Sequence, residues 1–349
     1  MTKARDIASA TTPNANAALL ATFPHRNLII NGAMQVAQRG TSFTGITSTI
    51  DYRMDRWQVG FGAAGSNYSI TQSTDAPDNF KYSIKWQRTA SNAVTNSIWF
   101  SQAFESVNSK VVAGKTCTLS YYAKKGANYS ATSSDIQVRI ISGTGTDQSA
   151  TSAITAGWTG YATPLSTTQV VTSSWVRYSH TVTFASNINQ ISVNLASNSA
   201  GTAGADDSLY ITGIQLELGS TATPFEHRSY GDELAACQRY CFVQGFDGTY
   251  EPLGIGYWKE STAVETVIKY PVPMRSAPSL SISTIGGLFC LIPNTDWRAC
   301  SAFSLNEAGK NGCKISLTVA TNGNFSTDGR RGSTIAFRSS GQAVWDAEL

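Results

Sequence analysis

The sequence predicts an all-β protein with two folded domains joined by a short helix. Serine and threonine make up about 23% of the 349 residues, with 29 Gly and only 4 Met, a balance that favours strands and turns over helices. Short apolar runs recur between residues 50 and 225 with polar turn clusters between them, the pattern of a β-sandwich. Because single domains cluster at roughly 100–200 residues, we expect a second, smaller β-sandwich domain after the first.

Composition excludes several classes of protein. Hydrophobic residues reach 41%, which is ample for a core and excludes global disorder. The net charge of +3 is spread without a long Lys/Arg run, so we expect no nucleic-acid partner. No apolar run approaches the roughly 20 residues of a membrane span, and the first residues lack the apolar stretch of a signal peptide. We therefore expect a soluble protein that is made in a cytoplasm and does not insert into membranes.

The six cysteines are expected to be free thiols, because they are too few and too scattered for a disulfide framework. Cys237 and Cys241 lie one helical turn apart, with His227 upstream. Since no second close Cys/His pair accompanies them, we interpret them as buried apolar side chains rather than zinc ligands.

Residues 1–25 predict an N-terminal attachment arm. They are rich in Ala, Thr and Asn, a composition that orders only against a partner. Leu19, Leu20 and Phe23 are the apolar anchors available for that partner.

Residues 26–228 predict the first sandwich. The clearest strand is 174–184, where Trp175 and Arg177 share one face while Val176 and Tyr178 share the other. Trp175 is nevertheless expected in the core, because it lies within a strand. The expected strands lie near 51–60, 67–73, 80–88, 95–104, 115–124, 135–142, 174–184, 189–196 and 207–218.

Residues 229–244 predict a helix that Ser229 can cap, with acidic residues in its first turn. Tyr230, Leu234, Cys237 and Cys241 repeat at 4-3-4 spacing, which fits a seam between copies of the chain. A linker helix that lies on its own domain explains the same spacing, and both interpretations stay open.

Residues 245–349 predict the second β-domain. Its expected strands lie near 250–258, 263–273, 280–285, 313–319 and 334–343, with prolines at strand ends or edges.

The chain lacks the usual catalytic motifs, and its three histidines leave little material for a catalytic triad. His180 is expected to be an ordinary histidine of a sheet. Asp206 and Asp207 are more typical of a structural calcium site or a solvated turn than of a glycosidase pair, and Asp51 and Asp55 are expected to be structural. We expect no catalytic residues and no cofactor, and leave a metal open.

Aromatic residues are abundant, and sugars stack on exposed rings. Trp57, Trp86 and Trp99 lie inside strands and are expected in the core. Four rings lie in loops or near strand ends and are therefore the candidates for carbohydrate contact: Trp158, Tyr161, Trp258 and Trp297.

Several stretches resemble a family of tailed-bacteriophage tail-fibre and receptor-binding proteins. They are Asn27 to Gly40, Asp51 to Trp57, Ser174 to Tyr178, Ile214 to Gly219 with Ala222 to Glu226, Glu233 to Tyr240 and the final Asp346 to Leu349. The resemblance covers about 27–242 well and the C-terminal domain weakly. It implies a jelly roll like that of carbohydrate-binding modules, a place in the virion and homotrimeric assembly, and it supplies no catalytic residues.

These observations lead us to expect a non-enzymatic tail fibre that is assembled in the host bacterial cytoplasm. Residues 1–25 would attach it to a phage tail or capsid protein, and residues 245–349 would bind host-surface polysaccharide. A capsid or neck decoration protein and a polysaccharide-degrading tail spike are the alternatives.

Overall fold

A computed structural model describes residues 25–47, 50–62, 67–245, 251–291, 297–319, 332–337 and 341–349. Most of the expected arm, 1–24, lies outside them. The chain divides into two compact units at Tyr230, and Leu349 belongs to the first unit. No helix among the described residues has the length and apolar character needed to cross a membrane.

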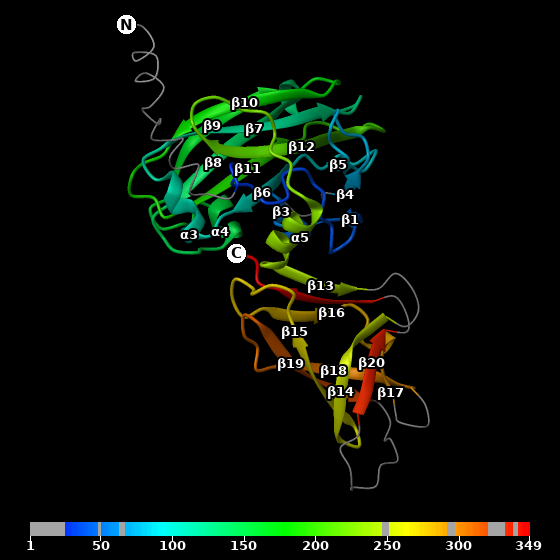
Figure 1. Ribbon diagram of the computed structural model, residues 1–349. Coiled ribbons are helices and arrows are strands. Elements are labelled where there is room, and N and C mark those ends of the chain that lie inside the picture. Colours follow the sequence, from blue (N-terminus) through cyan, green and yellow to red (C-terminus); the bar gives the residue numbers. More distant parts are fainter. Residues whose placement is uncertain are drawn as a thin grey trace, which may run out of the picture. The chain divides into compact units, whose positions relative to one another are not determined.

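The first unit is a jelly-roll sandwich of two six-stranded antiparallel sheets (Figure 1). Successive strands alternate for the most part between the two sheets, as in a jelly roll. Sheet 1 contains β1 (Ser42–Ile46), β4 (Tyr68–Ser73), β5 (Ser83–Arg88), β12 (Asp207–Leu218), β7 (Thr116–Lys125) and β10 (Val176–Thr183), in that order. Sheet 2 contains β2 (Asp51–Met54), β3 (Trp57–Phe61), β6 (Ser97–Ala103), β11 (Gln190–Asn198), β8 (Asp135–Gly143) and β9 (Ala162–Val170).

Short helical turns connect some of these strands. They are α3 (Ser106–Ser109), α4 (Ala150–Ile154) and the 3-10 turns η1 (Lys110–Val112) and η2 (Thr132–Ser134).

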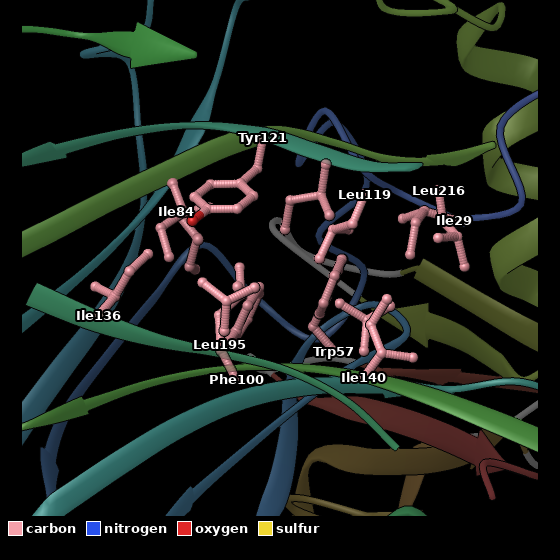
Figure 2. Close-up of a cluster of buried hydrophobic side chains, with 14 of the residues drawn as sticks. Ile29, Trp57, Ile84, Phe100, Leu119, Tyr121, Ile136, Ile140, Leu195 and Leu216 are labelled. Carbon is pink, nitrogen blue, oxygen red and sulfur yellow. The ribbon is translucent and has the colours of Figure 1, made fainter. Parts of the chain in front are cut away.

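The core of the first unit lies between the two sheets (Figure 2). Trp57 is fully buried there and stacks on Phe100, with ring centroids 4.4 Å apart. Trp86 is also buried in this core, as expected, whereas Trp99 is buried on the outer face of sheet 2 rather than between the sheets. Strand β10 shows the expected alternation, because Tyr178 packs against the core whereas Arg177 lies on the outer face of sheet 1.

The two most conspicuous sequence motifs, Asn27 to Gly40 and Asp51 to Trp57, build one structural unit. Asn31 Nδ2 donates to the carbonyls of Val36 and Asp55, and Trp57 Nε1 donates to the carbonyl of Asn31. Asp55 accepts hydrogen bonds from the backbone N and the side-chain amide of Gln38. Asp55 is therefore structural, as expected, and these motifs position the chain rather than form a ligand site.

Helix α5 (Tyr230–Gln238) starts at the boundary residue Tyr230, and the second unit consists of the rest of this helix followed mainly by β structure. A three-stranded sheet contains β13 (Cys241–Gly245), β21 (Gln342–Asp346) and β16 (Ser279–Ile282). A closed barrel contains β14 (Glu251–Glu260), β15 (Ala263–Lys269), β19 (Gly312–Val319), β18 (Trp297–Asn306), β17 (Leu288–Leu291) and β20 (Gly332–Phe337), and η3 (Ile285–Gly287) precedes β17.

The helix is shorter than expected. It ends at Gln238, and Cys241 opens β13, which pairs with β21 from the end of the chain. The four residues of the 4-3-4 spacing therefore do not form one stripe on a helix. The last of them, Cys241, lies in a strand that pairs with β21.

Glu265 is a buried carboxylate at the centre of a pH-sensitive charge cluster in the second unit. It accepts hydrogen bonds from the Tyr257 hydroxyl at 2.6 Å and from Lys259 Nζ at 3.0 Å, and Lys314 Nζ lies 4.0 Å away. The Tyr257 and Lys259 hydrogen bonds lower the pKa of Glu265 from 4.5 to about 2.

Glu265 is therefore expected to stabilise the second unit above pH 4.5, and this contribution should disappear as the pH falls towards 2. Urea unfolding of Glu265→Gln and of the unaltered chain should differ at pH 7 and converge between pH 4.5 and 2. A difference that stays constant over this range would contradict the assigned hydrogen bonds.

Candidate functional site

The two candidate rings of the first unit differ in exposure, because Trp158 is buried whereas Tyr161 is partly exposed. Trp158 is only 3% exposed, and its Nε1 donates to the Ser149 carbonyl at 2.9 Å. Tyr161 packs on the same small cluster. The expectation that Trp158 is exposed is wrong, because its loop folds back under α4 and Trp158 packs beside Ala150 and Ala153.

The two candidate rings of the second unit, Trp258 and Trp297, differ in exposure. Trp258 is 4% exposed and belongs to the core of the barrel, so its expected exposure is also wrong. The reason is strand alternation, which turns Trp258 inward and leaves Tyr257 outside. Trp297 is half-buried at the start of β18.

The seam candidates are mostly covered within the chain itself. Tyr230 is 56% exposed and Leu234 is half-buried, but Cys237 and Cys241 are buried. The burial of these two cysteines agrees with their interpretation as buried apolar side chains, and a seam between copies of the chain stays a prediction.

Partly exposed rings gather instead on the outer face of sheet 1, which we call the ring face. Tyr210 of β12 lies between Lys85 of β5 and Lys124 of β7 in register. Trp175, just before β10, packs edge-on against Tyr210 with centroids 6.3 Å apart. Lys124 Nζ lies over both rings, 4.9 Å from the centroid of Tyr210 and 5.6 Å from that of Trp175.

Asp75 holds this group together. Its carboxylate pairs with Lys124 and accepts a hydrogen bond from Trp175 Nε1 at 3.0 Å. Although desolvation alone would raise the pKa of Asp75, the hydrogen bonds from Lys124 and Trp175 outweigh it and keep the pKa below 3.8. The indole of Trp175 is thus fixed while its ring remains partly exposed.

The next row of the ring face opens into a pocket of about 690 Å³. Tyr122 of β7 pairs in register with Arg177 of β10, whose guanidinium carbon lies 5.8 Å from the Tyr122 centroid. Phe80 packs against Tyr122 and Phe225 with centroids 5.3 and 5.0 Å away. The residues lining the pocket are Asp78, Asn79, Phe80, Tyr122, Arg177, Pro224, Phe225 and His227.

Gly213 allows this pocket to form. It has a φ of +60° at a bulge in β12, and an added Cβ would lie 2.7 Å from the Phe80 ring. A side chain at this position would be strained and would displace Phe80.

The motif 214–226 holds the loop that carries Phe225. Glu217 accepts hydrogen bonds from Gln215 Nε2 at 2.7 Å and from the Thr223 backbone N at 2.9 Å, and it pairs with Arg26 at 3.3 Å. Glu217 is itself 1% exposed. The motif 214–226 thus holds Phe225 in its position beside the pocket.

The ring face could not be predicted from the sequence alone, for two reasons. The expectation that Trp175 lies in the core, drawn from its place within the expected strand 174–184, is wrong, although the face it shares with Arg177 indicates the outer side of the sheet. Phe80 and Phe225 are 145 residues apart, and only the fold brings them together.

The described residues contain no group of three His, Cys, Asp or Glu side chains placed to hold a metal ion. Asp207, a candidate for a calcium site, instead forms a buried ion pair with Arg88 at 3.5 Å.

No family model and no curated protein matches this sequence. Among solved structures, the chain is similar to a promiscuous carbohydrate-binding module of the β-sandwich superfamily (13% identity, TM-score 0.33), over 50% of this chain and 62% of that one. It is similar to a CBM4 module (15%, 0.32) over 54% and 98%. It is also similar to the enzymatically active domain of tailspike protein 4 of bacteriophage CBA120 (13%, 0.34) over 56% and 22%. The chain thus spans less than two thirds of the first module and of the tailspike domain.

Proposed function

We propose that this protein binds carbohydrate without chemical turnover, and that it does so through the ring face of its first unit. The observation that carries the proposal is the set of partly exposed rings held on a rigid sheet, with Lys85, Lys124 and Arg177 among them. Rings of this kind stack on the apolar C–H faces of sugars, while neighbouring polar groups bind the hydroxyls.

The biological setting that we propose is the virion of a tailed phage. The support is the resemblance of the motifs in 27–242 to tail-fibre and receptor-binding proteins. In this proposal residues 1–25 bind a phage tail or capsid protein, and a host surface polysaccharide is the ligand. Homotrimeric assembly is part of the same proposal, since three weak sites on one particle gain avidity.

Removing single rings should weaken glycan binding. Tyr122→Ala and Trp175→Ala in the full chain are each expected to weaken binding to arrayed bacterial capsular and O-chain polysaccharides about five- to tenfold, because a stacked ring contributes roughly 1–1.5 kcal/mol. Tyr257→Ala is the matched control, since Tyr257 is an exposed ring of the second unit.

The competing functions give different results in the same experiment. Loss of binding in Tyr257→Ala alone would move receptor binding to residues 245–349. An unaltered chain that binds none of the arrayed glycans would favour the decoration protein. Release of new reducing ends from the bound polysaccharide would indicate a degrading tail spike.

A further inference from the structure

A second feature lies on the opposite sheet of the first unit and is not used by the ring face. Gln58 of β3 pairs in register with Ser101 of β6, Ser101 with Asn194 of β11, and Asn194 with Arg139 of β8. We call these four residues the polar row. They form one line across four adjacent strands of sheet 2, roughly 14 Å long at the usual strand spacing.

The polar row points away from the hydrophobic core. Its neighbours along the strands, such as Phe100, Leu195 and Ile140, point between the sheets (Figure 2), and successive side chains of a strand alternate between faces. Despite lying on the outer face, Gln58 is 4% exposed, while Ser101 and Asn194 are fully buried.

The buried polar atoms of the row lack partners. Gln58 Oε1, Ser101 Oγ, Arg139 Nε and both amide atoms of Asn194 make no hydrogen bond. On the flanking positions of the same face, Trp99 Nε1, Ser192 Oγ and Gln190 Nε2 are also unpaired. Each such group destabilises the folded protein, and native proteins leave very few of them. Eight on one face of one sheet therefore indicate a missing partner.

The chemistry of these atoms restricts what the partner is. Amide and hydroxyl groups offer both donors and acceptors, as a ligand rich in hydroxyls requires. The row contains no carboxylate that would favour a metal ion, and Arg139 is its one cation. An apolar ligand would leave all of these groups unsatisfied, and an anion would leave the two amide oxygens, Gln58 Oε1 and Asn194 Oδ1, without a donor.

Access is from the β8–β9 side. Burial falls along the row from Asn194 through the half-buried Arg139 to the exposed Ser166 of β9, which pairs with Arg139. Helix α4 packs on β6 and β11, the strands in the middle of the row, and at the far end Gln58 Nε2 donates to Thr151 Oγ1 of this helix at 3.0 Å.

We propose that the polar row is a binding site for a neutral, hydroxyl-rich ligand, such as a saccharide or polyol, that enters over β8 and β9 when the long side chain of Arg139 moves aside. This site is separate from the ring face, which belongs to sheet 1. It would give the first unit a carbohydrate site on each sheet.

The strands provide a matched pair of variants. Ser101→Ala/Asn194→Leu removes three of the unpaired atoms from the middle of the row. Ser97→Ala/Asn198→Leu makes the same changes four residues further along the same two strands. There Ser97 Oγ donates to Asn198 Oδ1. Binding of xylohexaose, cellohexaose and isomaltohexaose to the full chain is measured by calorimetry, with the Trp99 indole N–H resonance as a local probe.

Stability and binding should change in opposite directions in the site variant. We expect its melting temperature to stay unchanged or rise while binding weakens about tenfold or more, because unpaired groups cost stability in the free protein. The melting temperature of the control variant should fall by roughly 2–4 °C, and this variant should bind the saccharides normally. Tyr122→Ala should leave the saccharide-induced change of the Trp99 resonance intact even if total binding weakens, which separates the polar row from the ring face.

Three results would overturn the proposal. The site variant could lose stability as the control does and bind normally, which would indicate ordered water alone in the row. The three saccharides could leave the Trp99 resonance unchanged in the unaltered chain. Tyr122→Ala could abolish all saccharide binding, which would leave the ring face as the single site.

Discussion

Trp57→Ala is expected to lower the free energy of unfolding of the first unit by about 3–5 kcal/mol, the usual cost of removing a fully buried large ring. The indole stacks on Phe100, and its Nε1 donates to the Asn31 carbonyl at 3.1 Å. The substitution therefore leaves a cavity and also releases the segment 27–40. Since domains are stable by only about 5–15 kcal/mol, this is a large fraction of the total.

Equilibrium unfolding in urea, followed by fluorescence and by circular dichroism, measures this loss. Trp175→Ala is the control, because Trp175 lies on the partly exposed ring face; it should cost less than about 1 kcal/mol. Equal losses in the two variants would contradict the assigned positions of the two rings.

Asp207→Ala should be about as damaging, with an expected loss of about 3–5 kcal/mol. Arg88 is 1% exposed, and Asp207 is the carboxylate paired with its guanidinium. Arg88 also donates to the Asn92 carbonyl at 2.6 Å and to Ser130 Oγ at 2.9 Å. Without Asp207 the positive charge stays buried with only neutral partners.

Two further variants separate the ion pair from a general effect of removing carboxylates. Asp51→Ala should cost at most about 1 kcal/mol, because Asp51 is exposed and pairs with Arg53 at the surface. Arg88→Met/Asp207→Leu should be less damaging than Asp207→Ala, because it removes both charges. A double variant as unstable as the single one would show that the loss does not come from the uncompensated charge.

The sequence by itself determined the elements whose signals are local. Alternation along 174–184 correctly separated Arg177 from Tyr178, and the turn clusters correctly indicated an all-β chain. Ser, Thr and Gly content and strand period act over a few residues, so they can be read from short stretches of sequence.

Only the tertiary structure decided which rings are covered. Trp158 lies in a loop and is buried, whereas Trp175 lies beside a strand and is partly exposed. The strand period tells which residues share a face, but not what packs on that face. In the same way, helix α5 ends at Gln238 because the next residues pair with β21, about 100 positions away.

Both proposed sites depend on such long-range contacts. Phe80 reaches Phe225 through the fold, and the polar row exists because four separate strands align Gln58, Ser101, Asn194 and Arg139 in register. Each of these residues is unremarkable in its own stretch of sequence. Register is set by the packing of the whole sandwich, and for that reason the sequence determined the strands while the tertiary structure determined the sites.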